Sequence, residues 1–328
     1  MTGWLTAVWD RLKLPWSVSS REYSCSYENV LGTSLELRIV SSSPSVAERA
    51  ERTALSEIDR LEQIFSRYRP GSEFAQWQKN RGVDTPVSDE LWDVLSACET
   101  WREHSRGAFH PATESLLQLW QDCAAENRLP TAGAIGRQRD QLGGNPWHLN
   151  ASRRSASCAR YPLSLHGIAK GYIVDRVCDA VLRSHAGVES VLLNVGGDLC
   201  VRGNTTRFVG IADPRRDAEN APFVATLCVT NGAMATSGDW RRGFWIGDTL
   251  YSHIIDGRTG FPASQFHSVS VLAPTAMEAD VLSTIFTILS PPECAAMAES
   301  LPEVGYLLLA RDGMAYQNLL WTQREVNE

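Results

Sequence analysis

Apolar residues follow two different spacings along the chain, and these spacings predict both strands and helices. Alternation of apolar and polar residues over Leu35–Val40 and over Ser268–Leu272 predicts a strand in each stretch. Over Ala47–Phe65 the apolar residues recur at every third or fourth position, which predicts a helix. Ser88–Glu90 supplies an acidic helix start, and we expect that helix to run to about His104.

The remaining apolar stretches predict further short elements. Gly167–Ser184 and Ala279–Leu289 are expected to be helices, and the second is apolar over most of its surface, so it should be buried. A hairpin of Val304–Ala310 and Met314–Asn318 is expected to close the chain around Asp312-Gly313. Other short strands are expected at Tyr161–Leu165, Val191–Val195, Phe208–Asp213, Val224–Val229 and Phe244–Ile246.

Helices and strands mix without the regular alternation of a parallel α/β protein. Several consecutive strands are joined by short links, so we predict an α+β fold with mixed, largely antiparallel sheets and packed helices. Residues 1–25 are expected to be an amphipathic or loose leader that serves as a packing arm, with a membrane-surface anchor as the alternative. Residues 26–328 are expected to form a single domain, which two interleaved lobes would also satisfy.

The composition narrows the function classes. Hydrophobic residues make up 43% of the chain and charged residues 21%, as in an ordinary soluble globular enzyme. The net charge of −7 and the isoelectric point near 5.6 argue against nucleic-acid binding, because a phosphate backbone requires a concentrated basic surface.

Compartment is predicted from the cysteines and the N-terminal residues. The eight cysteines include no CxxC pair, so most are expected to be buried thiols in a reducing compartment. The apolar run at the N-terminus is interrupted by Asp10, Arg11 and Lys13, and no stretch is apolar over the roughly 18 residues that a membrane span needs. We therefore predict a cytoplasmic protein without a transmembrane segment.

Two short patterns could hold a phosphate and a metal ion. Gly167–Gly171 (GIAKG) opens a predicted helix, where free backbone N–H groups and the positive end of the helix dipole favour an anion, and Lys170 adds a cation. Asp280 and Thr284 are spaced i, i+4, which places both oxygen side chains on one helix face, a geometry that Mg²⁺ can use. Taken alone, each pattern is more often structural than functional. The same holds for the lone His253.

The order of the motifs is more specific than any one of them. GIAKGY is followed by LNVGGDL at 193–199, ADPRR at 212–216, ATSGDW at 235–240, HIIDGRTGFP at 253–262 and EADVLST at 278–284. In this order they resemble the FAD:protein FMN transferase (ApbE) family, and the resemblance extends from about Leu31 to Leu309. It implies an ApbE-like, T-fold-related architecture. It also implies transfer of the FMN half of FAD to a Thr or Ser hydroxyl of an acceptor protein, with AMP as the leaving group and Mg²⁺ required.

The resemblance also implies roles for individual residues. His253 would be the base that takes the proton of the acceptor hydroxyl. The metal would be held by Asp280, Thr284, an oxygen of Ser283 and the backbone carbonyl of Gly167. The residues expected to contact FAD are Leu31, Tyr68, Ala108, Phe109, His110, Ser164, Lys170 and Ile255.

The chain departs from the usual family pattern at four of these places. His110 and Ser164 stand where the family commonly has Asp, Leu31 stands where it has Met, and Gly257 replaces the Pro of HIIDP. Two alternatives remain open. One is an FAD pyrophosphatase that uses water as acceptor, which the same metal and pyrophosphate site would permit. The other is a non-catalytic FAD-binding protein, which the His110 and Ser164 departures favour. The presence of His253 and Asp280 favours an enzyme.

Overall fold

An antiparallel sheet forms the centre of the computed structural model, which describes residues 11–12, 22–160, 162–215, 222–238 and 243–326. Within these residues nine strands pair in one sheet, and every pair is antiparallel. In spatial order the strands are β1 (Arg11–Leu12), β2 (Glu22–Val30), β3 (Thr33–Ser41), β7 (Val188–Val195), β8 (Asp198–Gly203), β11 (Gly232–Gly238), β14 (Phe266–Ala273), β15 (Gly305–Ala310) and β16 (Ala315–Gln317).

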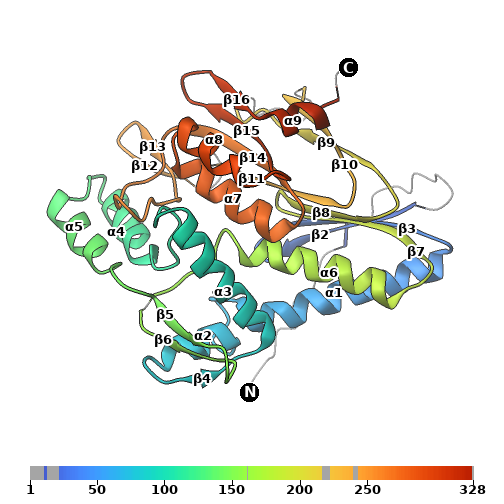
Figure 1. The fold of residues 1–328 in the computed structure, drawn as a ribbon, viewed down its shortest axis with the longest axis horizontal. Helices are drawn as coiled ribbons and strands as arrows, with labels where there is room; N and C mark the ends of the chain where they lie inside the picture. The colour runs from blue at the N-terminus through green and yellow to red at the C-terminus, as the bar shows by residue number, and fades with distance from the viewer. Residues whose placement is uncertain (1–10, 13–21, 161, 216–221, 239–242, 327–328) are drawn as a thin grey trace.

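The two faces of this sheet bury two separate hydrophobic clusters. Three helices cover one face: α1 (Pro44–Phe65), α6 (Ala169–Ser184) and α7 (Ala276–Ile288) (Figure 1). The other face packs against α9 (Leu319–Arg324) and the two-stranded sheet of β9 (Arg207–Ile211) and β10 (Ala225–Val229). Successive residues of one strand serve the two clusters, because side chains alternate across a strand; Leu193 faces the helices and Leu192 faces β9 and β10.

A second group of elements packs beside the helical layer (Figure 1). This second group contains α2 (Glu73–Lys79), α3 (Asp89–His104), α4 (Glu114–Ala125), α5 (Ala132–Asp140), α8 (Pro291–Glu299), the hairpin of β12 (Phe244–Ile246) and β13 (Thr249–Tyr251), and a small sheet of β4 (Thr85–Pro86), β6 (Ser155–Cys158) and β5 (Trp147–Asn150). Trp120 of α4 contacts the turn between β13 and β14, because its indole N–H donates to the carbonyl of Gly260 at 2.9 Å.

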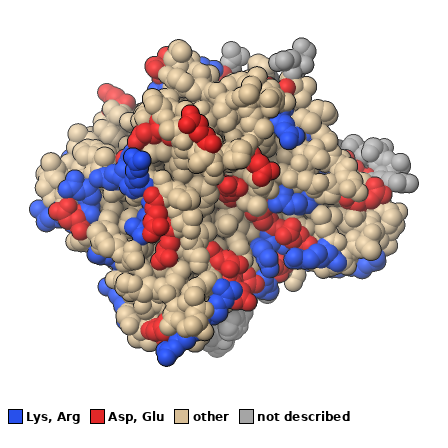
Figure 2. Space-filling view, in the orientation of Figure 1, with Lys and Arg blue, Asp and Glu red and all other residues tan. Residues whose placement is uncertain are grey.

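On the face of the molecule seen in Figure 2, acidic and basic side chains are interspersed.

Most of the predicted elements are present, but the strand predicted at Tyr161–Leu165 is wrong. Residues 162–165 form no ladder, and their backbone groups are satisfied in other ways. The N–H of Leu163 donates to the side chain of Gln78 at 2.8 Å, and the N–H of Ser164 donates to the carbonyl of Pro111 at 2.8 Å. Leu163 is buried in the core although it belongs to no strand, so its apolar side chain was not a sign of a strand here.

Several element boundaries also differ from the prediction; for example, α7 begins at Ala276, three residues before the predicted start at Ala279. The helix predicted at Gly167 begins at Ala169, after a turn in which Gly167 has a φ of +76°. Within the segment predicted as a leader, Glu22–Cys25 belongs to β2, and Cys25 is buried opposite Leu37. Residues 1–10 and 13–21, which hold the rest of that segment apart from β1, lie outside the described residues. In the part of the chain that the structure describes, no helix has the length and apolar character needed to cross a bilayer.

Helices α6 and α7 cross at very short range. A Cβ atom placed on Gly171 would lie 2.2 Å from the carbonyl oxygen of Ala276, so only glycine permits this approach. Asp175 of α6 fixes the start of α7, because its two carboxylate oxygens accept from the N–H groups of Ala276 and Met277, each at 2.9 Å. The two helices are therefore joined by backbone contact and by a buried cap.

Gly171→Ala should destabilise the protein, because the new methyl group meets backbone that cannot rotate away. We expect the free energy of unfolding to fall by about 3 kcal/mol, the upper end of usual overpacking costs. Gly136→Ala is the matched control: Gly136 lies inside α5 with nothing within 4 Å of the added methyl group. Glycine is unfavourable inside a helix, so the control should gain roughly 0.5–1 kcal/mol. Urea unfolding of both variants measures the difference, and equal effects would refute the crossing argument.

Candidate active site

A cavity of about 470 Å³ lies where the start of α6, the middle of α7, the ends of β7 and β11 and the turn after β13 meet. Its volume is in the usual range for small-molecule sites. Among the residues singled out from the sequence, its lining includes Phe109, His110, Ser164, Gly167, Lys170, His253, Ile255, Asp280 and Thr284. Four others lie elsewhere: Leu31, Tyr68, Ala108 and Ser283.

The turn before α6 brings backbone against the side chain of Thr284. A Cβ atom on Gly167 would lie 2.5 Å from Thr284 Oγ1, so glycine is needed both for its positive φ and for this close approach. The N-cap residue of α6, Ile168, makes no side-chain capping hydrogen bond. The N–H of Gly171, in the first turn, instead donates to Asp280 Oδ2 at 3.0 Å.

Two buried carboxylates and one ammonium group meet at this helix start. Asp280 is 5% exposed and Asp198 is 2% exposed. Lys170 Nζ lies 2.8 Å from Asp198 Oδ2 and donates to the carbonyl of Val195 at 3.3 Å. Burial, and next the charge of Asp198, raise the pKa of Asp280 to about 8, although Lys170 acts in the opposite direction. The charge of Lys170 is thus already compensated by an acidic partner.

The oxygen atoms beside this cluster fit a hard cation. Asp280 offers a carboxylate, Thr284 a hydroxyl and Gly167 a backbone carbonyl on the same wall, and oxygen ligands are the ones that Mg²⁺ prefers. The described residues contain no group of three or more His, Cys, Asp or Glu side chains arranged around a common metal position. Mg²⁺ commonly takes one or two carboxylates and completes its shell with water and substrate phosphates, so the oxygen donors of Asp280, Thr284 and Gly167 are of a kind that it could use.

Ser283, which was expected to supply a further oxygen, lies behind this wall. It is fully buried, and its hydroxyl donates to the carbonyl of Asp280 at 2.9 Å. The same hydroxyl lies 2.8 Å from Ser237 Oγ, so it connects α7 to β11. In this position the Ser283 side chain supports the helix that carries Asp280.

His253 lies half-buried on the turn after β13, at the cavity wall. The turn is held by short-range hydrogen bonds: the N–H of Ile254 donates to Ser252 Oγ at 3.1 Å, and the N–H of Ala263 donates to the carbonyl of Ile254 at 2.8 Å. An isolated bridge pairs Ile255 with Pro262. His253 therefore lines the cavity from a turn whose two ends are hydrogen-bonded to each other.

His110 faces the cavity, but its polar atoms are used within the protein. Nδ1 accepts from the N–H of Ala112 at 3.1 Å, and the ring also hydrogen-bonds the backbone of Leu142. Burial, with the charges of Arg102 and Arg160, lowers the pKa of His110 to about 4, so the ring is neutral near pH 7. Its contribution to a ligand is an apolar ring face, not a charge.

Three of the residues expected to contact FAD lie outside the lining: Tyr68, Leu31 and Ala108. Tyr68 is 74% exposed, with the guanidinium of Arg67 4.9 Å from its ring centroid, and Arg67 pairs with Glu114 of the lining. Leu31 occupies the β2–β3 turn with a φ of +50°, two residues before Thr33 of the lining.

The third residue, Ala108, has a structural contact. It is fully buried, and its carbonyl accepts from the N–H of Gly257 at 3.0 Å. A side chain at position 257 would collide with this loop, because a Cβ atom on Gly257 would lie 2.4 Å from the carbonyl oxygen of Gly107. The loop before α4 and the turn after His253 are therefore in backbone contact.

Asp198 is the main cavity residue to which sequence reasoning gave no role. The available signal was its position directly after Gly196-Gly197 at the end of a buried strand. The turn is closed by Asn194, whose side-chain oxygen accepts from the N–H of Gly197 at 3.1 Å, and both glycines have positive φ. This turn places the Asp198 carboxylate next to Lys170, a pairing that the local sequence does not indicate.

Comparisons with known proteins agree with this geometry. The model of the ApbE family matches residues 31–308. The FAD:protein FMN transferase of Treponema pallidum (strain Nichols) is 29% identical over 317 residues, which cover 89% of this chain and 85% of that protein. The FAD:protein FMN transferase of Haemophilus influenzae is 28% identical over 263 residues, which cover 76% of this chain and 75% of that protein.

Solved structures share the fold. The crystal structure of the ApbE protein of Thermotoga maritima matches with a TM-score of 0.81 at 26% identity, covering 94% of this chain and 100% of that one. The apo form of the Pseudomonas stutzeri flavinyl transferase ApbE matches with a TM-score of 0.76 at 24% identity, which is a likeness of fold alone, and covers 94% of this chain and 98% of that one. The predicted α+β, ApbE-like architecture is confirmed, and because the family model matches residues 31–308, the chain belongs to the ApbE family.

Proposed function

We propose that residues 26–328 form one catalytic unit that transfers the FMN half of FAD to a Thr or Ser hydroxyl of an acceptor protein and releases AMP. The observation that carries this proposal is the meeting of a candidate base, His253, and the Lys170–Asp198–Asp280 cluster at one cavity. The related proteins named FAD:protein FMN transferase support the same reaction. The cavity takes lining residues from the loop before α4 and from the main sheet, which supports a single unit.

The reaction requires a base at the acceptor hydroxyl. His253 removes the proton of that hydroxyl as its oxygen attacks the phosphorus of the FMN half. The bond between this phosphorus and the bridging oxygen of the pyrophosphate breaks, and AMP leaves with the bridging oxygen. The acceptor is left with a phosphoester bond to FMN, and the proton resides on His253 until solvent removes it.

The other cavity residues bind and orient the pyrophosphate. Asp280, Thr284 and the carbonyl of Gly167 would hold Mg²⁺, which would neutralise negative charge on the transferred and leaving phosphates. The first turn of α6 contributes backbone N–H groups and the positive end of its dipole. Lys170 contributes an ammonium group that Asp198 keeps in place.

Incubation of the full chain with FAD, Mg²⁺ and a candidate acceptor tests the proposal. We expect flavin fluorescence on the acceptor band and an equal amount of AMP. FMN and AMP without a labelled acceptor would instead indicate a pyrophosphatase. FAD binding without any AMP would indicate a non-catalytic binding protein.

Asp280→Asn should abolish the Mg²⁺-dependent reaction, because it removes the charged metal ligand but keeps an oxygen that can accept from Gly171. We expect turnover to fall on the order of 100-fold or more, and calorimetry should show weaker Mg²⁺ binding. Glu278→Gln is the matched control, since Glu278 lies on the same helix outside the cavity lining. Unchanged Mg²⁺ dependence in Asp280→Asn would exclude the metal assignment.

His253→Ala should slow the chemical step selectively. General-base catalysis contributes about 10²–10⁴-fold, so single-turnover transfer should fall by an amount on that order while FAD affinity changes little. If His253 only braces its turn, thermal stability and FAD affinity should fall together without a selective loss in rate. Measuring FAD binding, melting temperature and single-turnover transfer on the same variant separates the two roles.

We propose a cytoplasmic location for the protein. The eight cysteines, all of them among the described residues, form no disulfide and seven of them are buried, which suits a reducing compartment. Thiol labelling of denatured protein from fractionated cells should find every cysteine reactive and Met1 or Thr2 at the N-terminus, in the cytoplasmic fraction. A processed N-terminus with paired cysteines in an exported fraction would overturn this location.

A further inference from the structure

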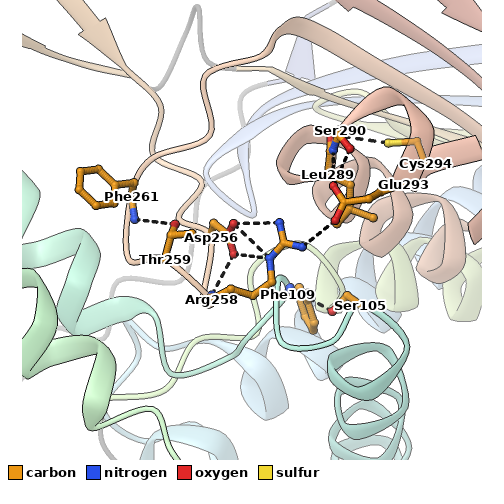
Figure 3. Close-up of polar contacts among 10 residues, drawn as sticks. All are labelled: Ser105, Phe109, Asp256, Arg258, Thr259, Phe261, Leu289, Ser290, Glu293 and Cys294. Atoms are coloured by element: carbon orange, nitrogen blue, oxygen red, sulfur yellow. Dashed lines mark hydrogen bonds and ion pairs between the residues drawn. The ribbon is translucent and has the colours of Figure 1, made fainter.

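The turn that follows His253 is closed by a buried carboxylate and an arginine (Figure 3). Asp256 is 8% exposed and accepts from Arg258 at both carboxylate oxygens, with Nε at 3.0 Å from Oδ1 and Nη2 at 3.0 Å from Oδ2. The backbone N–H of Arg258 also donates to Asp256 Oδ1 at 2.9 Å. A planar guanidinium held at two points has one orientation, so its remaining nitrogen points in a fixed direction.

That remaining nitrogen contacts the helix after α7. Arg258 Nη1 donates to Glu293 Oε1 at 3.0 Å. The second oxygen of Glu293 accepts from the backbone N–H of Ser290 at 2.8 Å and from its hydroxyl at 2.7 Å, which is the capping box of α8. Ser290 directly follows Leu289, the C-cap of α7 (Figure 3). One carboxylate thus joins the His253 turn to the junction between α7 and α8.

We propose that Arg258 and Glu293 are positioning residues: their ion pair holds the turn that carries His253 against the end of α7, the helix that carries Asp280. This inference rests on the proposed function, because it assumes that His253 and Asp280 act on the same substrate. The other contacts of the turn, from Trp120 to Gly260 and from Gly257 to Ala108, reach the α4 side of the molecule. The Arg258–Glu293 pair extends the support to the α7 side.

The pair suits a positioning role better than a stabilising one. The side chains of Arg258 and Glu293 are 31% and 47% exposed, and both line a second cavity of about 450 Å³ between α8 and the end of α3. Partly exposed ion pairs contribute little to global stability, so substitutions here should leave the protein folded. A shift of about 1 Å between reacting groups, by contrast, can cost on the order of 100-fold in rate.

Glu293→Gln tests this role, with Glu299→Gln on the same helix as the matched control. Glutamine keeps one oxygen for the Ser290 cap but lacks the charge and the second acceptor that Arg258 requires. We expect kcat for FMN transfer to fall on the order of 10-fold to 100-fold while KM for FAD stays within about twofold. Hydrogen–deuterium exchange should become faster across residues 254–263, whose amides hold the turn closed. Glu299→Gln should match the parent protein in all three measurements.

Arg258→Lys is the second variant, because it keeps the charge and loses the planar fork, and it should show the same kcat loss without a KM change. Glu293→Asp, which restores the charge, should recover part of the rate. An unchanged kcat in both Glu293→Gln and Arg258→Lys would overturn the proposal. An equal loss in Glu299→Gln, or a rise in KM and a fall in melting temperature that accompany the loss in kcat, would also overturn it, since both results indicate general damage to α8.

The same measurements separate this inference from the proposed function. If the parent protein transfers no FMN to any acceptor, the proposed function fails and no positioning role remains. If the parent transfers FMN and exchange across residues 254–263 is unchanged in Glu293→Gln, only the positioning role fails.

Discussion

The close crossing of α6 and α7 is the contact on which the rest of the site depends. The missing side chain of Gly171 lets the two backbones approach, and the Gly171 N–H then reaches the carboxylate of Asp280 at 3.0 Å. Asp175 of α6 caps the start of α7 and so fixes the position of α7 along α6. Because α6 begins beside Gly167 and α7 carries Thr284, the same crossing sets the separation of the oxygen atoms on the cavity wall.

The charges in the cavity favour simultaneous binding of a cation and an anion. Two buried carboxylates, Asp198 and Asp280, share one ammonium group, Lys170, so the cluster carries excess negative charge whenever Asp280 is ionised. A pyrophosphate would add further negative charge next to it, which is unfavourable in a poorly solvated site. A divalent cation held by Asp280 would stabilise this carboxylate and the phosphates together. Each ligand should therefore strengthen the binding of the other, as linkage requires.

The sequence predicted local structure well because hydrophobic periodicity is a local property. The alternation of Leu35–Val40 and the helical spacing of Ala47–Phe65 appear in the structure as β3 and α1. Tyr161–Leu165 failed because apolar residues can be buried without a ladder, and its hydrogen-bond partners come from Gln78 and Pro111, far away in the chain. Motif order, in contrast, brought together cavity residues separated by more than 100 positions, since it carries family information that periodicity lacks.

The sequence could not predict which hydrogen-bond partners the side chains of the site have. The replacement of Asp by His at 110 and by Ser at 164 favoured a protein that binds FAD without catalysis. In the structure, however, His110 Nδ1 accepts from the N–H of Ala112 in its own loop, the ring also hydrogen-bonds the backbone of Leu142 after α5, and Ser164 Oγ accepts from the N–H of His166 at 3.2 Å. Both side chains therefore bond to nearby backbone, and none of these hydrogen bonds involves Lys170, Asp198 or Asp280. The departures at 110 and 164 are therefore not evidence against the chemistry that we propose at His253 and Asp280.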